Sequence, residues 1–316
     1  MKAFALPDEV SPATYMDLPT PEPGPGEVRV KVRAASVNGW DVFVASGMAR
    51  GMMEHRYPVV TGKDYAGVID ALGEGVTRFS VGDEVLGITP PAPHLDRGPY
   101  AEYLVVPAEG FIEAKPAGLS FEQAAAVGLA ALTALVSADA ADVHEGSVVL
   151  VAGATGGVGN YAVQISAARG AHVIATGKPA DESTLRAIGA EEVVDYSGDV
   201  AEAVRALHPD GIDALIDAVN RDEAHASLAA LVRDGGAVAS TTSAADVEGL
   251  ASRNVAGSNV FAQSDPSEFA RVVEMAGRGE LSVPLTKTYG FDDIPEALGL
   301  SGSRHSRGKV VITTGW

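Results

Sequence analysis

The pattern of hydrophobic and polar positions changes near residue 119. Before that point, short stretches of alternating hydrophobic and polar residues are separated by turn residues, as at Glu27–Arg33, Ala66–Leu72 and Asp83–Ile88. Alternation with a period of two predicts half-buried strands. The first third of the chain is therefore expected to form a small, mostly antiparallel, barrel-like domain.

After residue 119, the pattern predicts strands that alternate with helices. Ser120–Gln123 has the spacing of a capping box and precedes an alanine-rich helical stretch. The hydrophobic run Ser147–Ala152 predicts a buried parallel strand. A glycine-rich turn, a helix over Asn160–Arg169 and a strand over Ala171–Thr176 then complete one βαβ unit.

The alternation continues beyond this unit. It predicts helices over 183–188, 200–207 and 223–232, and strands over 192–196, 212–217 and 236–240. This order predicts a doubly wound parallel sheet. The last strand, Gly308–Thr313, has no following helix and is expected to return to the first domain. We therefore expect an α/β chain with a cofactor domain at 120–284 and a catalytic domain at 1–119, completed by 285–316.

Composition narrows the classes of function. The chain has 316 residues, and its formal net charge of -19 opposes binding to nucleic acids and anionic lipids. The lack of cysteine excludes disulfides, thiolate metal sites and a catalytic cysteine. No apolar run appears long enough to span a bilayer, and Met1–Pro7 lacks a signal-peptide pattern. We expect a cytoplasmic protein without nucleic-acid or membrane partners.

The strongest motif is the turn at 153–159, with the sequence GATGGVG between a predicted strand and a predicted helix. In this context glycines allow close approach of a pyrophosphate, and the helix N-terminus favours an anion. Ala154 replaces one glycine of the usual pattern, which matters little because backbone N–H groups bind the phosphates. The alternative is a turn that only packs the helix on the strand. The expected phosphate-binding residues are Ala154, Thr155, Gly156, Gly157, Val158 and Gly159.

The end of the predicted strand Ala171–Thr176 favours NADPH over NADH as the cofactor. An NAD site usually has an acidic residue there, which binds the ribose 2′-hydroxyl. Here the strand ends in Thr176-Gly177-Lys178, which leaves room and positive charge for a 2′-phosphate. Tyr196, at the end of the next strand, could lie near the adenine. A solvated lysine and a half-buried tyrosine are the alternatives for Lys178 and Tyr196.

Several stretches occur in the order typical of one known family. They are Ala35–Asp41, Thr61–Val68, Val81–Val85, Tyr100–Tyr103, the turn at 153–159 and the closing Gly308–Val311. Over essentially its whole length the chain resembles the medium-chain dehydrogenase/reductase superfamily, in its zeta-crystallin-like quinone oxidoreductase branch. The resemblance implies a GroES-like, mostly β catalytic domain and a Rossmann cofactor domain.

The resemblance also implies a reductase without zinc. Asn38, Lys63-Asp64 and the neighbourhood of Leu129 stand about where zinc-containing members have their ligands, and the seven histidines show no paired ligand spacing. We expect no metal. The zinc-free branch moves hydride from NADPH to conjugated acceptors. The implied activity is reduction of a quinone or an α,β-unsaturated carbonyl. The alternatives are a dedicated enoyl reductase or tailoring enzyme, and a largely non-catalytic NADPH-binding protein.

The resemblance places the active site in the cleft between the domains. Asn38 is expected to hold the acceptor oxygen, Asp41 to orient a neighbour, and Lys63 to stabilise the oxyanion or donate a proton. The alternatives are a turn-forming Asn38, a capping Asp41 and an ion pair of Lys63 with Asp64. Phe43 stands where many members have tyrosine. The other expected residues are Trp40, Phe43, His94 and Tyr100 for the substrate pocket, and Thr133, Val219, Phe261 and Lys309 for the cofactor. A homodimer is also expected.

Overall fold

The computed structural model describes residues 1–262, 265–303 and 307–316. The chain divides into two compact units. We call Met1–Leu129, Asp265–Gly277 and Val283–Trp316 the β-rich unit. Ala130–Ser264 and Arg278–Ser282 are called the parallel-sheet unit.

The β-rich unit is organised around strand β3, Glu27–Val37. Its sheet has the order β10-β7-β6-β3-β18-β17, and β9 also pairs with β3. Val28, Val30 and Val32 alternate along β3 and are fully buried, as the period-two pattern predicts. The other elements of this sheet are β6 Asp64–Leu72, β7 Glu84–Ile88, β9 Tyr103–Pro107, β10 Ile112–Ala114, β17 Leu285–Gly290 and β18 Lys309–Thr313.

The closing strand returns to the first part of the chain, which confirms the expectation for it. β18 pairs antiparallel with β3, with Val310 opposite Val37. The smaller elements of the unit surround this sheet. They are β1 Lys2–Leu6, β2 Thr14–Asp17, β4 Glu54–His55, β5 Val59–Val60, β8 His94–Leu95, α1 Gly39–Ala45, α8 Pro266–Gly277, η2 Phe291–Asp293 and α9 Ile294–Gly302.

Helix α2, Phe121–Ala140, begins at the predicted capping box. Ser120 N donates to Gln123 Oε1 (3.0 Å), and Gln123 N donates to Ser120 Oγ (3.2 Å). The helix is kinked at Gly128. Contrary to the expectation from sequence, its length and hydropathy would suffice to cross a membrane. Its most apolar window is 72% buried inside the protein, as in the core helix of a folded domain.

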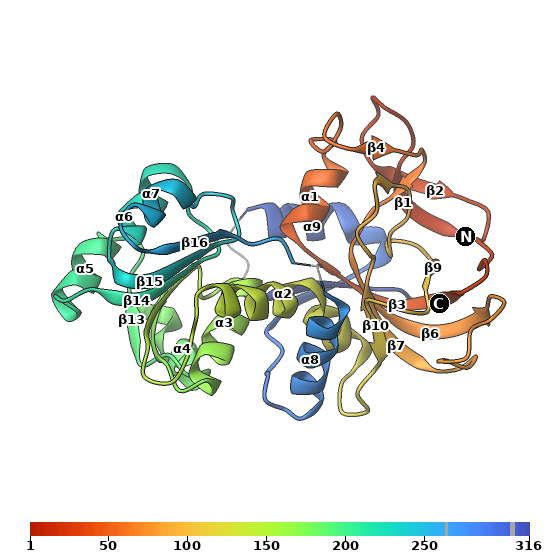
Figure 1. Cartoon of the computed structure of the whole chain (residues 1–316). Coiled ribbons are helices and arrows are strands. Elements are labelled where there is room, and N and C mark those ends of the chain that lie inside the picture. Colours follow the sequence, from red (N-terminus) through yellow and green to blue (C-terminus); the bar gives the residue numbers. More distant parts are fainter. Residues whose placement is uncertain (263–264, 304–306) are drawn as a thin grey trace. The chain divides into compact units, whose positions relative to one another are not determined.

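The parallel-sheet unit contains six parallel strands in the order β13-β12-β11-β14-β15-β16. Figure 1 shows α3 and α4 on one side of this sheet and α6 and α7 on the other. The strand order reverses between β11 and β14, as in a doubly wound fold. The strands are β11 Val148–Ala152, β12 His172–Thr176, β13 Glu192–Val194, β14 Ile212–Asp217, β15 Val232–Ser240 and β16 Ala256–Asn259.

The helices of this unit largely follow the predicted alternation. They are α3 Gly157–Ala168, η1 Pro179–Asp181, α4 Glu182–Ala187, α5 Val200–Leu207, α6 Asp222–Ala229 and α7 Val247–Ala251. The predicted helix end at Val232 is wrong, because α6 ends at Ala229 and Val232 already belongs to β15. The register between β14 and β15 shifts there, and Gly235 has a φ of 81°. Glycine permits this conformation, which allows β15 to begin earlier than its hydrophobic run.

Candidate functional site

The glycine-rich turn joins β11 to α3. Gly153 has a φ of 82°, which favours glycine. A Cβ on Gly159 would lie 2.1 Å from the Gly153 carbonyl oxygen, so only glycine lets α3 begin this close to the strand. At Gly156, the nearest atom to a Cβ would be the Gly153 carbonyl oxygen, at 3.3 Å. The three glycines thus have different roles in one turn.

The N-terminus of α3 can bind an anion. Its N-cap residue is Gly156, which has no side chain to occupy the first N–H groups of the helix. The helix is 12 residues long, and its dipole favours negative charge at this end. Gly153 N donates to Thr176 Oγ1 (2.9 Å), which fixes the turn against the end of β12. These features fit the pyrophosphate of a dinucleotide.

The polar residues after β12 and β13 lie together. The Lys178 ammonium is 5.7 Å from the centre of the Tyr196 ring, and that ring is exposed. Asp181 is buried, and its carboxylate accepts from Lys178 N (3.1 Å). This bond closes the short η1 helix. Asp195 is partly exposed; hydrogen bonds from Ser197, and then the charge of Lys178, lower its pKa.

Sequence reasoning missed a buried pair beside the turn. Asp217, at the end of β14, is fully buried and accepts from His225 Nδ1 (2.8 Å), Val219 N (3.1 Å) and Asn220 N (2.9 Å). Burial by itself would raise the pKa of Asp217, but these hydrogen bonds outweigh it and lower the pKa. A Cβ on Gly153 would lie 3.2 Å from Val219, so Asp217 and His225 fix the residue that faces the turn.

The remaining expected cofactor residues have varied surroundings. Val219 and Phe261 are exposed, and Phe261 follows the edge strand β16. Thr133 is buried in α2, where its carbonyl accepts from Ser137 Oγ (2.7 Å). Contact of these three residues with a cofactor stays a prediction.

A second group of polar residues lies inside the β-rich unit, around Asp64. Asp64 is fully buried at the start of β6. Its Oδ2 accepts from Ser36 Oγ (2.6 Å) and Asn38 Nδ2 (2.9 Å), and its Oδ1 accepts from Leu129 N (2.8 Å). A Cβ on Gly128 would lie 2.4 Å from Asp64 Oδ1, so the kink in α2 leaves space for this carboxylate.

Lys309 supplies the positive charge of this group. Its ammonium donates to Asn38 Oδ1 (2.5 Å) and Val37 O (3.1 Å) and lies 3.6 Å from Asp64 Oδ2. The side chain is 3% exposed. Burial lowers the pKa of Lys309, and the charges of Asp64 and Asp41 oppose that shift. Lys309 was expected to contact the cofactor; its ammonium binds Asn38 within its own unit.

The amide of Asn38 is already hydrogen-bonded at both ends. Its Nδ2 donates to Asp64 Oδ2 and also to Asp41 Oδ2 (3.3 Å). Both amide hydrogens therefore face carboxylates. A substrate oxygen would have to replace the longer bond, to Asp41, which makes Asn38 less available than the sequence suggested.

Asp41 has the capping role that was one of the two expectations. Its Oδ2 accepts from Asn38 N (2.8 Å) at the start of α1 and from Tyr100 Oη (3.3 Å). The residue is fully buried. Burial, and next the charge of Asp64, raise the pKa of Asp41 to about 7. Asp41 also orients Asn38, so both expected roles occur together.

Lys63 is the neighbouring cation. Its ammonium donates to Thr89 O (3.2 Å), whereas the carboxylate of Asp64 faces Lys309. Burial lowers the pKa of Lys63, and the charges of Asp41 and Asp64 oppose this shift. The alternative of a Lys63–Asp64 ion pair is therefore not the arrangement found. A partly buried ammonium with a lowered pKa can release a proton more easily than an exposed one.

The expected pocket residues do not form one surface. Trp40 and Phe43 have ring centres 5.8 Å apart and pack on a hydrophobic cluster that contains Leu6 and Val44. Tyr100 is only 1% exposed, and its hydroxyl donates to Ser36 O and Asp41. It supports Asp41 from the interior, and its role in lining a substrate pocket stays a prediction.

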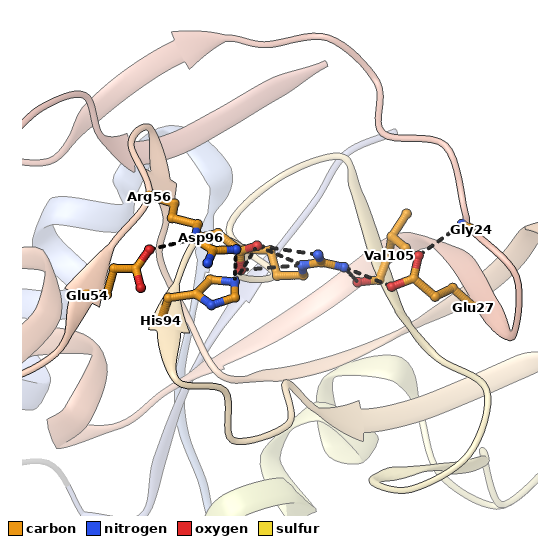
Figure 2. A network of polar contacts seen from close by, with 8 residues as sticks. Gly24, Glu27, Glu54, Arg56, His94, Asp96 and Val105 are labelled. Atoms are coloured by element: carbon orange, nitrogen blue, oxygen red, sulfur yellow. Dashed lines mark hydrogen bonds and ion pairs between the residues drawn. The ribbon is translucent and has the colours of Figure 1, made fainter.

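The loop before Tyr100 is held by ion pairs, as Figure 2 shows. His94 Nε2 lies 3.4 Å from Asp96 Oδ2 and 3.2 Å from a guanidinium nitrogen of Arg56. Arg97 pairs with Glu27 (3.1 Å) and Asp96 (3.3 Å). These contacts hold the loop in place and occupy His94 with protein partners.

The positions that the sequence resemblance equates with zinc ligands do converge here. Asn38, Asp64 and the backbone of Leu129 meet at one place, together with the ammonium of Lys309. This set offers one carboxylate and an amide, with neither imidazole nor thiolate. A buried ammonium already faces the carboxylate. The residues present do not fit a zinc ion.

Known proteins share both units of the chain. Residues 24–116 match the family described as alcohol dehydrogenase GroES-like domain, and residues 188–312 match zinc-binding dehydrogenase. A mitochondrial NAD(P)H oxidoreductase of Homo sapiens is 30% identical over an alignment of 327 positions, which covers 90% of this chain and 81% of that protein.

Two further similar proteins are a much longer synthase and a quinone oxidoreductase of solved structure. The phthioceranic/hydroxyphthioceranic acid synthase of Mycobacterium tuberculosis is 32% identical over 304 residues, which are 90% of this chain but 14% of the synthase. The solved structure of the quinone oxidoreductase from Coxiella burnetii has a TM-score of 0.89 and 28% identity, with 99% of both chains covered.

Proposed function

The chain belongs to the medium-chain dehydrogenase/reductase superfamily, and we propose that it is a zinc-independent, NADPH-dependent reductase of quinones or α,β-unsaturated carbonyls. It is an oxidoreductase that uses a nicotinamide cofactor. The observation that carries the finer proposal is the group formed by the half-buried Asn38 and the buried Asp64 and Lys309. An ammonium lies there among the positions that resemble zinc-ligand positions.

Zinc independence limits the reaction type. Without a Lewis acid, the protein has little means to lower the pKa of a bound alcohol. A conjugated acceptor avoids this need, because it stabilises the added negative charge as an enolate or a hydroquinone anion. Orientation and a few hydrogen bonds then suffice for catalysis. This argument favours reduction of quinones and enones over oxidation of alcohols.

NADPH is proposed because of the charge after β12. Lys178 and the exposed Tyr196 lie together there, and the nearby Asp181 is buried and bonded to backbone. An ammonium favours the 2′-phosphate of NADPH, whereas an available carboxylate would favour NADH. Asp195 lies within electrostatic range of Lys178 and weakens this preference.

The nicotinamide cofactor supplies the hydride when it is bound. In the proposed mechanism, the N-terminus of α3 holds the pyrophosphate and Lys178 holds the 2′-phosphate. Lys63 stabilises the developing oxyanion of the acceptor and gives it a proton from Nζ, which water then returns to Lys63. Asn38 and Asp41 position this region through their hydrogen bonds.

The test combines cofactor binding with turnover. NADPH and NADH are titrated by nicotinamide fluorescence, and then a small quinone or an enone is added. We expect tighter binding of NADPH and its oxidation by an acceptor. Lys63→Ala should lower turnover by about 100-fold, and Asn38→Ala should lower it less, while both keep their affinity for NADPH. Unchanged turnover in both variants would contradict the assigned roles.

A dedicated enoyl reductase is the second candidate. The match to one segment of a large synthase favours it. An enoyl thioester should then be reduced with a much higher kcat/KM than simple quinones. A largely non-catalytic NADPH-binding protein would bind the cofactor and oxidise it with none of these acceptors.

We extend the proposal to a cytoplasmic homodimer without nucleic-acid or membrane partners. The net charge of -19 opposes anionic surfaces. Phe261 is 74% exposed and lies two residues after β16, the edge strand of its sheet, which suits an interface between copies. Light scattering should give twice the chain mass, and Phe261→Asp should shift it toward the monomer.

A further inference from the structure

Three potential metal ligands meet at one edge of the parallel-sheet unit. His172 is the first residue of β12, Glu192 is the first residue of β13, and His208 follows the last turn of α5. Parallel pairing of β12 with β13 places Glu192 opposite Ile174, two residues along the strand from His172. The spacing of the three residues in the sequence does not reveal this cluster. The pairing of β12 with β13 and the position of the end of α5 bring the side chains together.

The side chains converge on one point. Glu192 Oε1 lies 2.7 Å from His172 Nε2 and 3.2 Å from His208 Nε2, and Glu192 Oε2 lies 3.3 Å from His208 Nε2. The exposed fractions are 31% for His172, 25% for Glu192 and 19% for His208. The cluster is therefore supported by the protein on one side and open to water on the other.

His172 has a carboxylate at each ring nitrogen. Its Nδ1 lies 2.8 Å from Glu191 Oε2, and its Nε2 faces Glu192. A neutral imidazole has one N–H donor and one acceptor, so one of these contacts would bring a lone pair against a carboxylate oxygen. The arrangement is satisfied by a second proton or by a cation at Nε2.

We propose that His172, Glu192 and His208 form a binding site for a divalent transition-metal ion of the zinc class. Two imidazoles and one carboxylate are ligands that zinc accepts, and water can complete a tetrahedron from the open side. Ligand atoms about 2.0–2.2 Å from zinc lie a little over 3 Å apart. The three ligand atoms lie within 4.8 Å of one another, and the 2.7 Å contact has to lengthen when an ion binds.

Glu191 would have a supporting role in this site. A carboxylate that accepts from the second nitrogen of a metal-binding histidine fixes the ring and its tautomer. Glu191 is itself held, because Arg186 donates to its backbone carbonyl. Protons compete with a metal ion for the ligand atoms, so binding should weaken as the pH falls.

The site is separate from the proposed cofactor site. His172 and Glu192 begin their strands, whereas Thr176 ends β12 and Tyr196 follows the end of β13. A bound ion would tie the three-residue edge strand β13 to α5 and stabilise this edge. The inference does not depend on the proposed reductase activity.

The test is calorimetric titration of the full chain with ZnCl₂ after dialysis against a chelator. We expect one ion per chain. His172→Gln, Glu192→Gln and His208→Gln should each weaken binding at least tenfold, and Glu191→Gln should weaken it less. His144→Gln is the matched control, because His144 is exposed in the same unit and contacts a backbone carbonyl of its own loop. Its binding should match that of the native chain.

A second measurement covers the case in which a variant fails to fold. Co²⁺ added to the native chain should give the visible absorption of a four-coordinate ion, and zinc should remove it. The proposal would be overturned if the cobalt spectrum is absent and the titration with ZnCl₂ gives no heat of binding. It would also be overturned by folded His208→Gln and Glu192→Gln variants that bind zinc as tightly as the native chain. NADPH binding, measured on the same samples, reports separately on the proposed function.

Discussion

The glycine-rich turn and the Asp64 group are built in opposite ways. The turn at 153–159 uses consecutive residues and backbone N–H groups, with glycines where a side chain would collide. The Asp64 group uses side chains from β3, β6 and β18 and the half-buried Asn38, and its charged members Asp64 and Lys309 are buried. The first depends on steric fit, whereas the second depends on charge balance and hydrogen bonding, so each should fail under different changes.

The largest effect is expected from breaking the charge balance. Asp64→Asn leaves the buried ammonium of Lys309 without its carboxylate and should lower the free energy of unfolding by about 3 kcal/mol. Chemical denaturation measures this loss. In the double variant with Lys309→Met, much of the loss should be recovered, since neither charge remains. The coupling would be contradicted if the double variant lost as much free energy of unfolding as the two single variants together.

The turn should respond to added volume. Gly159→Ala places a Cβ 2.1 Å from the Gly153 carbonyl, so α3 must move; we expect a loss of about 2 kcal/mol in stability and a clear loss of NADPH affinity. Gly156→Ala has more space and should weaken NADPH binding while largely sparing stability. Gly118→Ala, with no atom within 4 Å, is the control and should change neither quantity.

The two charged residues near the proposed 2′-phosphate site, Lys178 and Asp195, can be tested separately. Lys178→Ala should weaken NADPH binding about tenfold, or about 1.4 kcal/mol, and leave NADH binding nearly unchanged. Asp195→Asn should act in the opposite direction, because it removes a negative charge near Lys178. Equal effects on both cofactors would argue that Lys178 does not face the 2′-phosphate.

The smallest effect concerns pH. The pKa of Asp41 is raised from 3.8 to about 7, so the folded chain binds a proton that the unfolded chain releases between these values. Stability from this group is present at low pH and lost as the pH rises through about 7; from pH 8 to pH 6 the gain should be about 1 kcal/mol. Asp41→Asn, measured at both pH values, should remove this gain. A pH dependence unchanged by the substitution would assign it to other groups.

Local sequence was sufficient for the regular elements. The alternation of hydrophobic runs with helical stretches predicted the order of β11–β15 and their helices, and the capping box located the start of α2. The end of α6 was missed because a register shift and Gly235 start β15 early. Helical and strand preferences overlap in such short apolar stretches.

The roles of individual side chains were harder to predict from the sequence. Tyr100 and Lys309 were expected to contact ligands; their side chains lie in the group around Asp41 and Asp64, and ligand contact by either stays a prediction. Asp217 and His225 were missed because the only signal is a carboxylate at a strand end and a histidine in the next helix. That signal is common, and only the fold shows that both support Val219 beside the turn.

The sequence by itself determined the doubly wound unit, the closing strand and the glycine-rich turn, because each follows from periodicity or from a few consecutive residues. The tertiary structure alone decided which charges meet. Lys309 reaches Asn38 across 271 positions, and His172, Glu192 and His208 converge through sheet register. Burial then sets the pKa of Asp41, and burial arises only when distant segments pack together.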